Sequence, residues 1–331
     1  MRAGVMALVL AAATGCGRYA DFRLPEVAGP GVLPPSGVRL QAQPVIEGGG
    51  AGEWDSRDAL NPSVVRRGSL YYNCYSGFDG QTWHTGLAVS ADGSKWDKRG
   101  KVLSPGPAAW EGDYIAANGS LFDSGEEFLY WYQSGPRELP RIGLARSADA
   151  AHWRKHPAPV LGTGPWGSWD ERGVADPYVI RRAGAFYMFY LGQDRARRQR
   201  LGIARSADGV TWTRLRSNPV MELGVPGAFD EEGLGEPAVW AASGYYWMLY
   251  VGRDRKENRK LGLARSRDGL EWRRVPLAAS GGQEWNSRVV CDPEIEVRAG
   301  GVRIWFGGGD RASPDEFLNG RIGVGELDFG Q

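Results

Sequence analysis

A unit of 56–60 residues recurs along most of this chain and constrains its fold more than any other feature. An aromatic residue opens the unit five times, and successive openings are 56, 59, 60 and 56 positions apart: Trp54, Trp110, Trp169, Phe229 and Trp285. A period that fills a chain is typical of repeat architectures, in which each unit packs against its neighbours. The fold must therefore place five similar units in similar surroundings.

A second set of segments marks a turn in four of the units. Each segment carries Ser, Asp and Trp at the same spacing: SADGSKW (Ser90–Trp96), SADAAHW (Ser147–Trp153), SADGVTW (Ser206–Trp212) and SRDGLEW (Ser266–Trp272). Asp-Gly between two strand-forming runs is a strong hairpin signal. Each unit also has an aromatic run, such as FYMFYLG, and a run that begins at an acid or amide followed by proline. The pattern therefore predicts four strands in each unit.

Five units of four antiparallel strands predict an all-β fold, a five-bladed β-propeller over residues 38–331. The fifth unit ends after its third strand, RIGVGELDF (Arg321–Phe329), whereas VRLQAQPVIEGG (Val38–Gly49) resembles the fourth strands of other units. Because a ring without that strand would expose sheet edges, we expect the N-terminal strand to pair near Arg321–Leu327 and close the ring. Four tryptophans open units and four end Ser-x-Asp segments, so eight of the 14 tryptophans are expected to be architectural.

The N-terminus resembles the signal peptide of a bacterial lipoprotein. Residues 1–15 contain one basic residue, Arg2, and an apolar run that ends near Ala13, and Cys16 follows as the residue to be lipidated. An ordinary secretory signal with an incidental cysteine is the alternative. Residues 16–37 are rich in proline and glycine and are predicted to form a tether. We expect an exported protein, lipid-anchored to a bacterial membrane, at the outer membrane or the cell surface.

The remaining cysteines, Cys74 and Cys291, are predicted to be buried free thiols, and a disulfide between them is the alternative that export permits. The 40 basic and 39 acidic residues balance, so the clustered basic charge of a nucleic-acid site is not expected. There is no dedicated metal motif, so we predict no cofactor, and a structural calcium ion in the channel has no support. We expect a monomer that touches the membrane only through its anchor.

Polar residues occupy the heads of the five first strands. In a propeller these heads lie at the mouth of the central channel, and here they are Asn61, Asn118, Asp176, Glu236 and Asp292. A carboxyl group in that position is partly desolvated and close to others, and both effects raise its pKa. A raised pKa suits a general acid that works near neutral pH.

The five units, the ARSxDGxxW segments and the ADP and GEP strand heads resemble the five-bladed propeller glycosidases. The similarity is greatest to glycoside hydrolase family 43 and its relatives that cleave arabinosides, xylosides and fructosides, and it covers about residues 38–329. The resemblance implies that an acid on blade one is the general base or nucleophile. It also implies that Asp176 tunes pKa and orientation and that Glu236 is the general acid.

Asn61 departs from this pattern, because it stands where the blade-one acid is expected. An amide cannot take a proton from water. Three alternatives remain open for the base: Asp58 or Asp55 in the same loop, Asp292 on the neighbouring blade, or a group of the substrate itself.

A second polar ring is expected on the mouth side, in the hairpins between second and third strands. It contains His84 and three Asp-Arg pairs: Asp194–Arg195, Asp254–Arg255 and Asp310–Arg311. The arginines are candidates to bind sugar hydroxyls or an acidic sugar, and an ion-pair lattice between blades is the alternative. The predicted catalytic residues are Glu236, Asp176 and Asp292. The predicted substrate-binding residues are Asn61, Asn118, Arg195, Arg255, Arg311 and His84.

These features predict a glycoside hydrolase that acts on a poly- or oligosaccharide of the arabinose, xylose or fructose type. The alternative is a non-catalytic propeller that binds glycan or protein at the cell surface and has lost its base at Asn61. The retained Asp176 and Glu236 favour the enzyme, because a scaffold needs neither. A sialidase-type enzyme ranks last, because its Asp-containing segment is one residue longer and its propeller has six blades.

Overall fold

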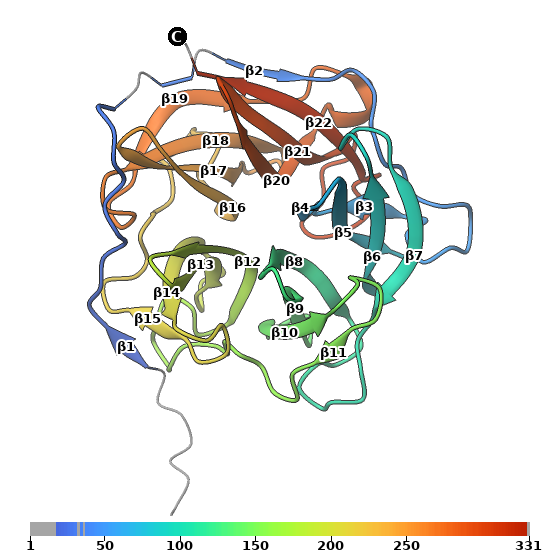
Figure 1. The fold of residues 1–331 in the computed structure, drawn as a ribbon, viewed down its shortest axis with the longest axis horizontal. Helices are drawn as coiled ribbons and strands as arrows, with labels where there is room; N and C mark the ends of the chain where they lie inside the picture. Colours follow the sequence, from blue (N-terminus) through green and yellow to red (C-terminus); the bar gives the residue numbers. More distant parts are fainter. Residues whose placement is uncertain (1–17, 32–33, 36, 330–331) are drawn as a thin grey trace, which may run out of the picture.

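The computed structural model describes residues 18–31, 34–35 and 37–329. Their strands form five antiparallel units, the blades, around a central channel (Figure 1). Blade one contains β3 (Asp58–Leu60) and β4 (Val64–Arg67), which share the innermost position, then β5 (Leu70–Phe78), β6 (Trp83–Ser90) and β7 (Asp97–Leu103). Blade two contains β8 (Ile115–Asp123), β9 (Phe128–Gly135), β10 (Arg141–Ser147) and β11 (Arg154–Lys155).

The other three blades repeat this order. Blade three contains β12 (Gly173–Arg182), β13 (Ala185–Gln193), β14 (Gln199–Ser206) and β15 (Thr213–Leu215). Blade four contains β16 (Gly233–Ala242), β17 (Tyr245–Arg253), β18 (Arg259–Ser266) and β19 (Arg273–Ala279). Blade five contains β20 (Val289–Arg298), β21 (Gly301–Gly309), β22 (Arg321–Asp328) and β2 (Gly37–Leu40). A single 3₁₀ turn, η1 (Glu284–Asn286), precedes β20. The predicted propeller of four-stranded blades is confirmed.

Contacts between blades bring their strand heads together. In three places the start of a third strand makes a parallel contact with the start of the next first strand: Trp83 with Ile115, Gln199 with Gly233, and Arg259 with Val289. The blades therefore follow one another around the ring in chain order. We call the side that carries these strand starts the mouth face.

The N-terminal strand closes the ring, as the sequence predicts. Strand β2 pairs antiparallel with β22, from Gly37 opposite Asp328 to Leu40 opposite Gly325. Ile46 makes a further bridge to Ile322. The last blade is therefore built from both ends of the chain, and its outer strand leaves no gap in the sheet.

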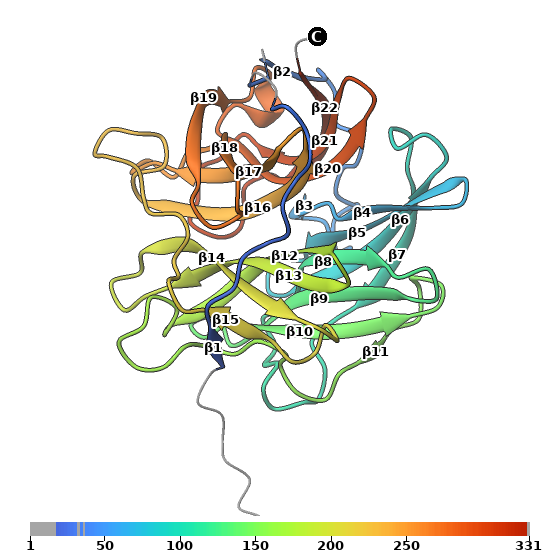
Figure 2. The same cartoon turned by 60° about the vertical axis from the view of Figure 1, so that its left-hand side comes forward.

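The segment that the sequence analysis treats as a tether is docked on the propeller where it is described. Strand β1 (Tyr19–Ala20) pairs parallel with β15, and Leu24 and Val27 are buried in the core between blades three and four. Figure 2 shows this blue segment rising from β1 towards β2 along the outside of the ring. This corrects the interpretation of residues 16–37 as a free tether, because apolar side chains at every few positions hold the segment down. Cys16 and the predicted signal lie outside the described residues.

In four of the five units the opening aromatic lies across two glycines of its own blade, and in blade two Trp110 lies across one, Gly143. A Cβ atom added at Gly192 or Gly202 would come within 2.2–2.4 Å of the Trp169 ring. Because real carbon atoms do not approach this closely, the ring fits only where both strands lack a side chain. This explains why the aromatic and the two glycines recur together in the sequence.

A buried acid follows that aromatic and joins inner and outer strands, in an arrangement we call the blade clamp. Four clamps combine this acid with a tyrosine of the second strand and a cation of the fourth: Asp55–Tyr75–Lys98, Glu111–Tyr132–Lys155, Asp170–Tyr190–Arg214 and Asp230–Tyr250–Arg274. In blade three, Tyr190 Oη donates to Asp170 Oδ2 over 3.2 Å and Arg214 Nε donates to the same atom over 2.8 Å. Charge-assisted bonds of this kind are the stronger ones.

Blade five replaces the clamp with neutral groups. Asn286 and Phe306 take the places of the acid and the tyrosine, and Trp285 Nε1 donates to the Ala42 carbonyl over 2.9 Å. The cation position is taken by Leu40, which lies opposite Gly325 as Arg214 lies opposite Ala204. The closing blade therefore avoids burying a carboxylate that has no cationic partner.

Cys74 and Cys291 are free and buried, as the sequence favours, so no disulfide joins them. Within the described part of the chain, no helix has the length and apolar character needed to span a bilayer.

The clamps lead to a stability prediction. Asp170→Asn should lower the free energy of unfolding by about 3 kcal/mol, because Arg214, only 5% exposed, would lose its buried partner. The matched variant Asp230→Asn should cost less, because its partner Arg274 is 40% exposed and can be hydrated. Urea unfolding curves measure both values. Equal losses in the two variants would contradict the proposed role of burial.

Candidate active site

The five strand heads converge at the channel mouth, where all of them line one cavity. Each head has a left-handed backbone, with φ between 45° and 51°: Asn61, Asn118, Asp176, Glu236 and Asp292. In blades two to five the strand register shifts across the head, which identifies a β-bulge. Bulges re-aim side chains and are common beside functional sites. The bulge turns each head side chain towards the channel.

The left-handed conformation is least favourable at Glu236. Asn and Asp tolerate it, whereas a longer side chain there costs roughly 1–2 kcal/mol. The next blade stabilises the Glu236 side chain in this position, because the Asp292 backbone N–H donates to Glu236 Oε2 over 2.9 Å. In the same way the Asn61 N–H donates to Asp292 Oδ2 over 3.1 Å. Successive heads are thus bonded side chain to backbone around part of the ring, and such strain is typical of functional sites.

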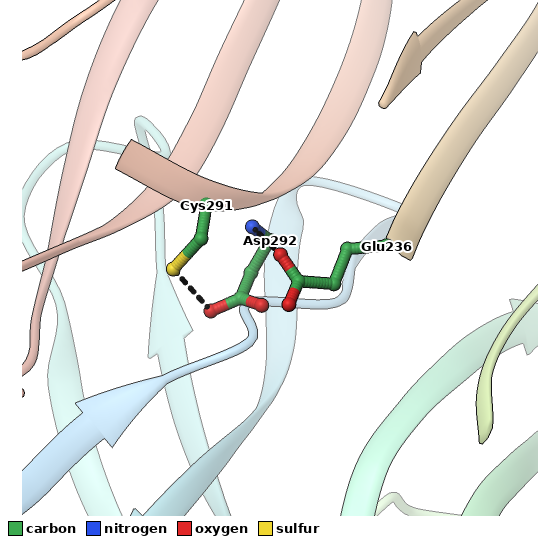
Figure 3. A group of neighbouring side chains, drawn as sticks. All are labelled: Glu236, Cys291 and Asp292. Carbon is green, nitrogen blue, oxygen red and sulfur yellow. Dashed lines mark hydrogen bonds between the residues drawn. The ribbon is translucent and has the colours of Figure 1, made fainter. Parts of the chain in front are cut away.

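Glu236 and Asp292 form a carboxyl pair (Figure 3). Their carboxyl oxygens and the Cys291 sulfur all lie within 4.8 Å of one another. Burial, and then the negative charge of Glu236, raise the pKa of Asp292 well above its ordinary value. Two carboxyl groups this close in a buried place cannot both ionise at neutral pH, so the pair holds one proton.

Hydrogen bonds fix the Asp292 carboxyl group in place. Asp292 accepts three donors: the Asn61 backbone N–H, the Asn61 side-chain amide over 2.7 Å, and the Cys291 thiol over 3.0 Å. Donors stabilise the ionised form of a carboxylate. Burial and the charge of Glu236 outweigh this effect, because the pKa of Asp292 stays well above its ordinary value.

Asp176 lies on the other side of Glu236 and is also perturbed. Burial, and after it the charge of Glu236, raises the pKa of Asp176 to about 7, although Arg259 and bonds from Asn118 and the Glu236 backbone oppose the shift. The mouth therefore contains two carboxyl groups with raised pKa, those of Asp176 and Asp292, on either side of Glu236.

The cavity has a volume of about 270 Å³ and a largely polar lining. Four arginines line it that the sequence analysis did not single out: Arg137, Arg197, Arg253 and Arg259. Arg259 starts β18 and donates to the Ser313 carbonyl over 3.3 Å. The signal that could have found it is its place at the start of a third strand, next to the heads, because Gln199 occupies the same place in blade three and also lines the cavity.

The predicted rim residues lie elsewhere, and this corrects the sequence analysis. Arg195, Arg255 and Arg311 are 54–71% exposed at their side chains and do not line the mouth cavity; Arg195 and Arg255 pair with acids of their own blades. His84 is buried and bonds to Ser104 and Asp79. The predicted alternative of an ion-pair lattice between blades also differs from the structure, because the Arg195–Glu171 and Arg255–Glu232 pairs each lie within one blade.

Neither alternative acid of blade one reaches the cavity. Asp55 belongs to a blade clamp. Asp58 accepts the backbone N–H groups of Phe317 and Gly320, both over 2.7 Å, and thereby holds the loop of blade five. Three acids of this chain were candidates to replace the base that Asn61 cannot supply. Of these, Asp292 is the one that lies at the mouth.

A further acid, which is not one of the heads, is buried beneath them. Glu294 borders a small cavity of about 40 Å³ below the ring of heads. Tyr178 donates to Glu294 Oε1 and Ser63 donates to Oε2, both over 3.1 Å. Burial raises the pKa of Glu294 to about 7.

The group of Glu236, Cys291 and Asp292 also offers three atoms of the kind that bind metal ions. Some of their lone pairs already accept hydrogen bonds, three at Asp292 and one at Glu236. A cation would have to displace this thiol proton and compete with these donors. The arrangement therefore fits a shared proton better than a resident cation.

The sequence matches the family model described as "Glycosyl hydrolases family 32 N-terminal domain" over residues 116–291. It is 28% identical over 226 residues to the uncharacterized protein Rv1502 of Mycobacterium tuberculosis, covering 64% of this chain and 73% of that protein. It is 30% identical over 147 residues to a 1,2-beta-oligomannan phosphorylase of Thermoanaerobacter sp., covering 43% of this chain and 45% of that protein.

Solved structures resemble the whole ring. One is described by the words "The GH130 family of mannoside phosphorylases contains glycoside hydrolases that target beta-1,2 mannosidic linkages in Candida mannan", with a TM-score of 0.71, 17% identity, and 92% and 97% of the two chains covered. Another is a glycosyl hydrolase from Bacteroides ovatus, with a TM-score of 0.70, 16% identity, and 91% and 94% covered. At these identities the likeness concerns the fold.

The raised carboxyl pKa values predict that stability falls as pH rises. Between about pH 4 and 7 the unfolded chain loses protons that Asp176 and Glu294, each with a pKa of about 7, retain when folded. The folded state then binds more protons, so the free energy of unfolding decreases with pH across this window. Asp176→Asn should flatten the slope by roughly 1–3 kcal/mol between pH 5 and 8. Urea unfolding at both pH values tests this, and an unchanged slope would refute it.

Proposed function

Because the chain belongs to the family of the glycosyl hydrolases family 32 N-terminal domain, we propose that it cleaves a glycosidic bond in an oligo- or polysaccharide at the mouth cavity. The observation that carries this proposal is the carboxyl pair of Glu236 and Asp292, which retains one proton beside a polar cavity. Glu236 donates that proton to the leaving oxygen. Asn61 positions Asp292 through its two donors.

Asp292 is too close to Glu236 to act as the base on the opposite face of a sugar. Inverting glycosidases separate their two carboxyl groups by about 6.5–9.5 Å to make room for water, and here the carboxyl oxygens lie within 4.8 Å. Among the heads, Asp176 is then the remaining carboxyl group. A pKa of about 7 suits a group that accepts a proton from water near neutral pH.

Phosphorolysis is the second candidate, and the cavity lining favours it. An amide stands at the blade-one head, while four arginines line the cavity. Arginine is well suited to bind phosphate. In this reaction a phosphate oxygen attacks the anomeric carbon, the glycosidic bond breaks, and the Glu236 proton goes to the leaving oxygen. No protein base is needed. The similarity to a 1,2-beta-oligomannan phosphorylase supports this candidate.

We place β-1,2-linked mannosides first among substrates, because two of the relatives are named for them. The arabinose, xylose and fructose types predicted from the sequence stay predictions. Incubation with β-1,2-oligomannosides, arabinan, xylan and fructan, each with and without inorganic phosphate, separates the candidates. A sugar phosphate indicates phosphorolysis, a free sugar indicates hydrolysis, and binding without cleavage indicates the non-catalytic propeller.

Glu236→Gln should reduce cleavage about 10²–10⁴-fold for substrates with poor leaving groups, because it removes the proton donor and preserves the shape. Aryl glycosides with good leaving groups need less protonation and should lose less. The control is Glu232→Gln in the loop before β16, an exposed acid that pairs with Arg255. Steady-state rates on both substrate classes measure the effect. Equal losses on both would mean that another group is the acid.

Asn61→Asp should impair the site. It would replace the amide donor, 2.7 Å from Asp292 Oδ1, by a second carboxyl group. The charged pair would repel, so we expect a stability loss of about 2 kcal/mol at pH 8, less at pH 5, and at least about a tenfold loss of activity. Asn61→Ala is the control that removes the donor without adding charge. A gain of hydrolysis in Asn61→Asp would instead identify this head as the vacant position of the base.

We also propose that the protein is exported and lipidated at Cys16, on the signal-like pattern of residues 1–15. Cys16→Ser should move the protein from the membrane fraction to the soluble fraction. Fractionation followed by immunoblotting measures this. An unchanged distribution would contradict lipidation at this residue.

A further inference from the structure

Trp166 is a large apolar side chain that the fold exposes. It is 85% exposed, more than Leu70, Val225, Val297 or Phe317, the other exposed large hydrophobic residues in the described part of the chain. A single exposed apolar residue needs no explanation in itself. Trp166 is distinguished by the polar groups that fix it in place.

Three residues hold the Trp166 loop. The Arg195 guanidinium lies 3.6 Å from the centre of the indole ring, in a cation–π contact. Glu171 holds Arg195 by two hydrogen bonds, from Nε over 3.1 Å and from Nη2 over 3.0 Å. Glu171 also accepts the Gly167 N–H over 2.8 Å, at a glycine with φ of +82° that follows Trp166. Arg195 covers one face of the ring and leaves the other open.

Blade four contains the same support without the aromatic ring. Glu231 accepts the Gly227 N–H over 2.8 Å, and Arg255 contacts Glu231 and Glu232. The residue at the position of Trp166 is Pro226, because Gly227 corresponds to Gly167. The support therefore belongs to the repeat, and blade three differs by presenting a flat aromatic surface on it.

The Trp166 loop lies next to the mouth cavity. Arg195 lies in the hairpin between β13 and β14, and Arg197, two residues further on, lines the cavity. Two residues span at most about 7 Å. A depression on blade three is bordered by Gly167, Glu171, Asp194 and Arg195, the residues next to and beneath Trp166. A chain leaving the cavity past Arg197 would reach the open face of Trp166.

We propose that Trp166 is an outer binding site for a polysaccharide chain, on which one sugar ring stacks while another part of the chain occupies the mouth cavity. A sugar ring presents C–H groups on one face, which pack on an aromatic ring, and hydroxyls at its edge, which remain hydrated or bond to polar groups at the rim. This proposal rests on the proposed function for the identity of the ligand, but it makes a binding claim of its own.

Affinity electrophoresis of the full chain in gels containing mannan, arabinan, xylan or fructan tests the proposal. At least one polymer should retard the wild type, and Trp166→Ala should weaken that binding about three- to tenfold, as expected for one lost stacking contact. Trp166→Phe should keep most of it. Val225→Ala is the control, because it truncates another exposed apolar residue in the corresponding loop of blade four, and it should bind as the wild type does.

The outcomes separate this proposal from the proposed function. Retardation that depends on Trp166, in a protein that cleaves none of the four polymers, upholds the outer site and counts against the enzyme. Cleavage of oligosaccharides without any retardation by a polymer overturns the outer site and leaves the enzyme standing. Equal binding by the wild type and Trp166→Ala also overturns it.

Discussion

The ring depends on carboxylates buried between the strands of each blade. In four blades an acid at the start of the unit binds both a tyrosine of the second strand and a cation of the fourth. The outermost strand is short, only two residues in β11 and three in β15, so backbone pairing alone gives it little hold. The clamp supplies the missing attachment from inside the blade. In these four blades it also fixes the loop that leads into the first strand, and thereby the position of the head.

Each repeat thus has two positions for buried polar groups, the clamp and the head, and the acids at these positions differ in the groups that surround them. The clamp acids each have a cation within hydrogen-bonding distance, as Asp170 has Arg214. Glu236 and Asp292 have each other, and their donors are backbone, amide and thiol groups. Paired charges stabilise a fold, whereas unpaired ones share protons. The repeat therefore pairs its structural acids with cations, whereas Asp292 and Asp176, at the heads, have raised pKa.

Most of the fold could be predicted from the sequence, because the same pattern of residues recurs in five units. Fixed spacing of Trp169, Gly192 and Gly202 reflects a ring that needs two bare strands beneath it. The heads could be placed for the same reason, since each precedes a proline or glycine and lies seven or eight positions after the opening aromatic. The partners of single residues could not be placed. Arg195 and Arg197 are two positions apart in one hairpin, and only three-dimensional structure distinguishes the one that lies over Trp166 from the one that lines the cavity.

The docked N-terminal segment has a mechanical consequence. Before it reaches β2, the chain is held by the parallel pairing of β1 with β15 and by buried Leu24 and Val27. Tension applied through Arg18 is therefore borne first by blade three and the groove beside blade four. It reaches the β2–β22 seam only after those contacts have failed. The β2–β22 pairing that closes the ring is therefore not the first contact to bear this force.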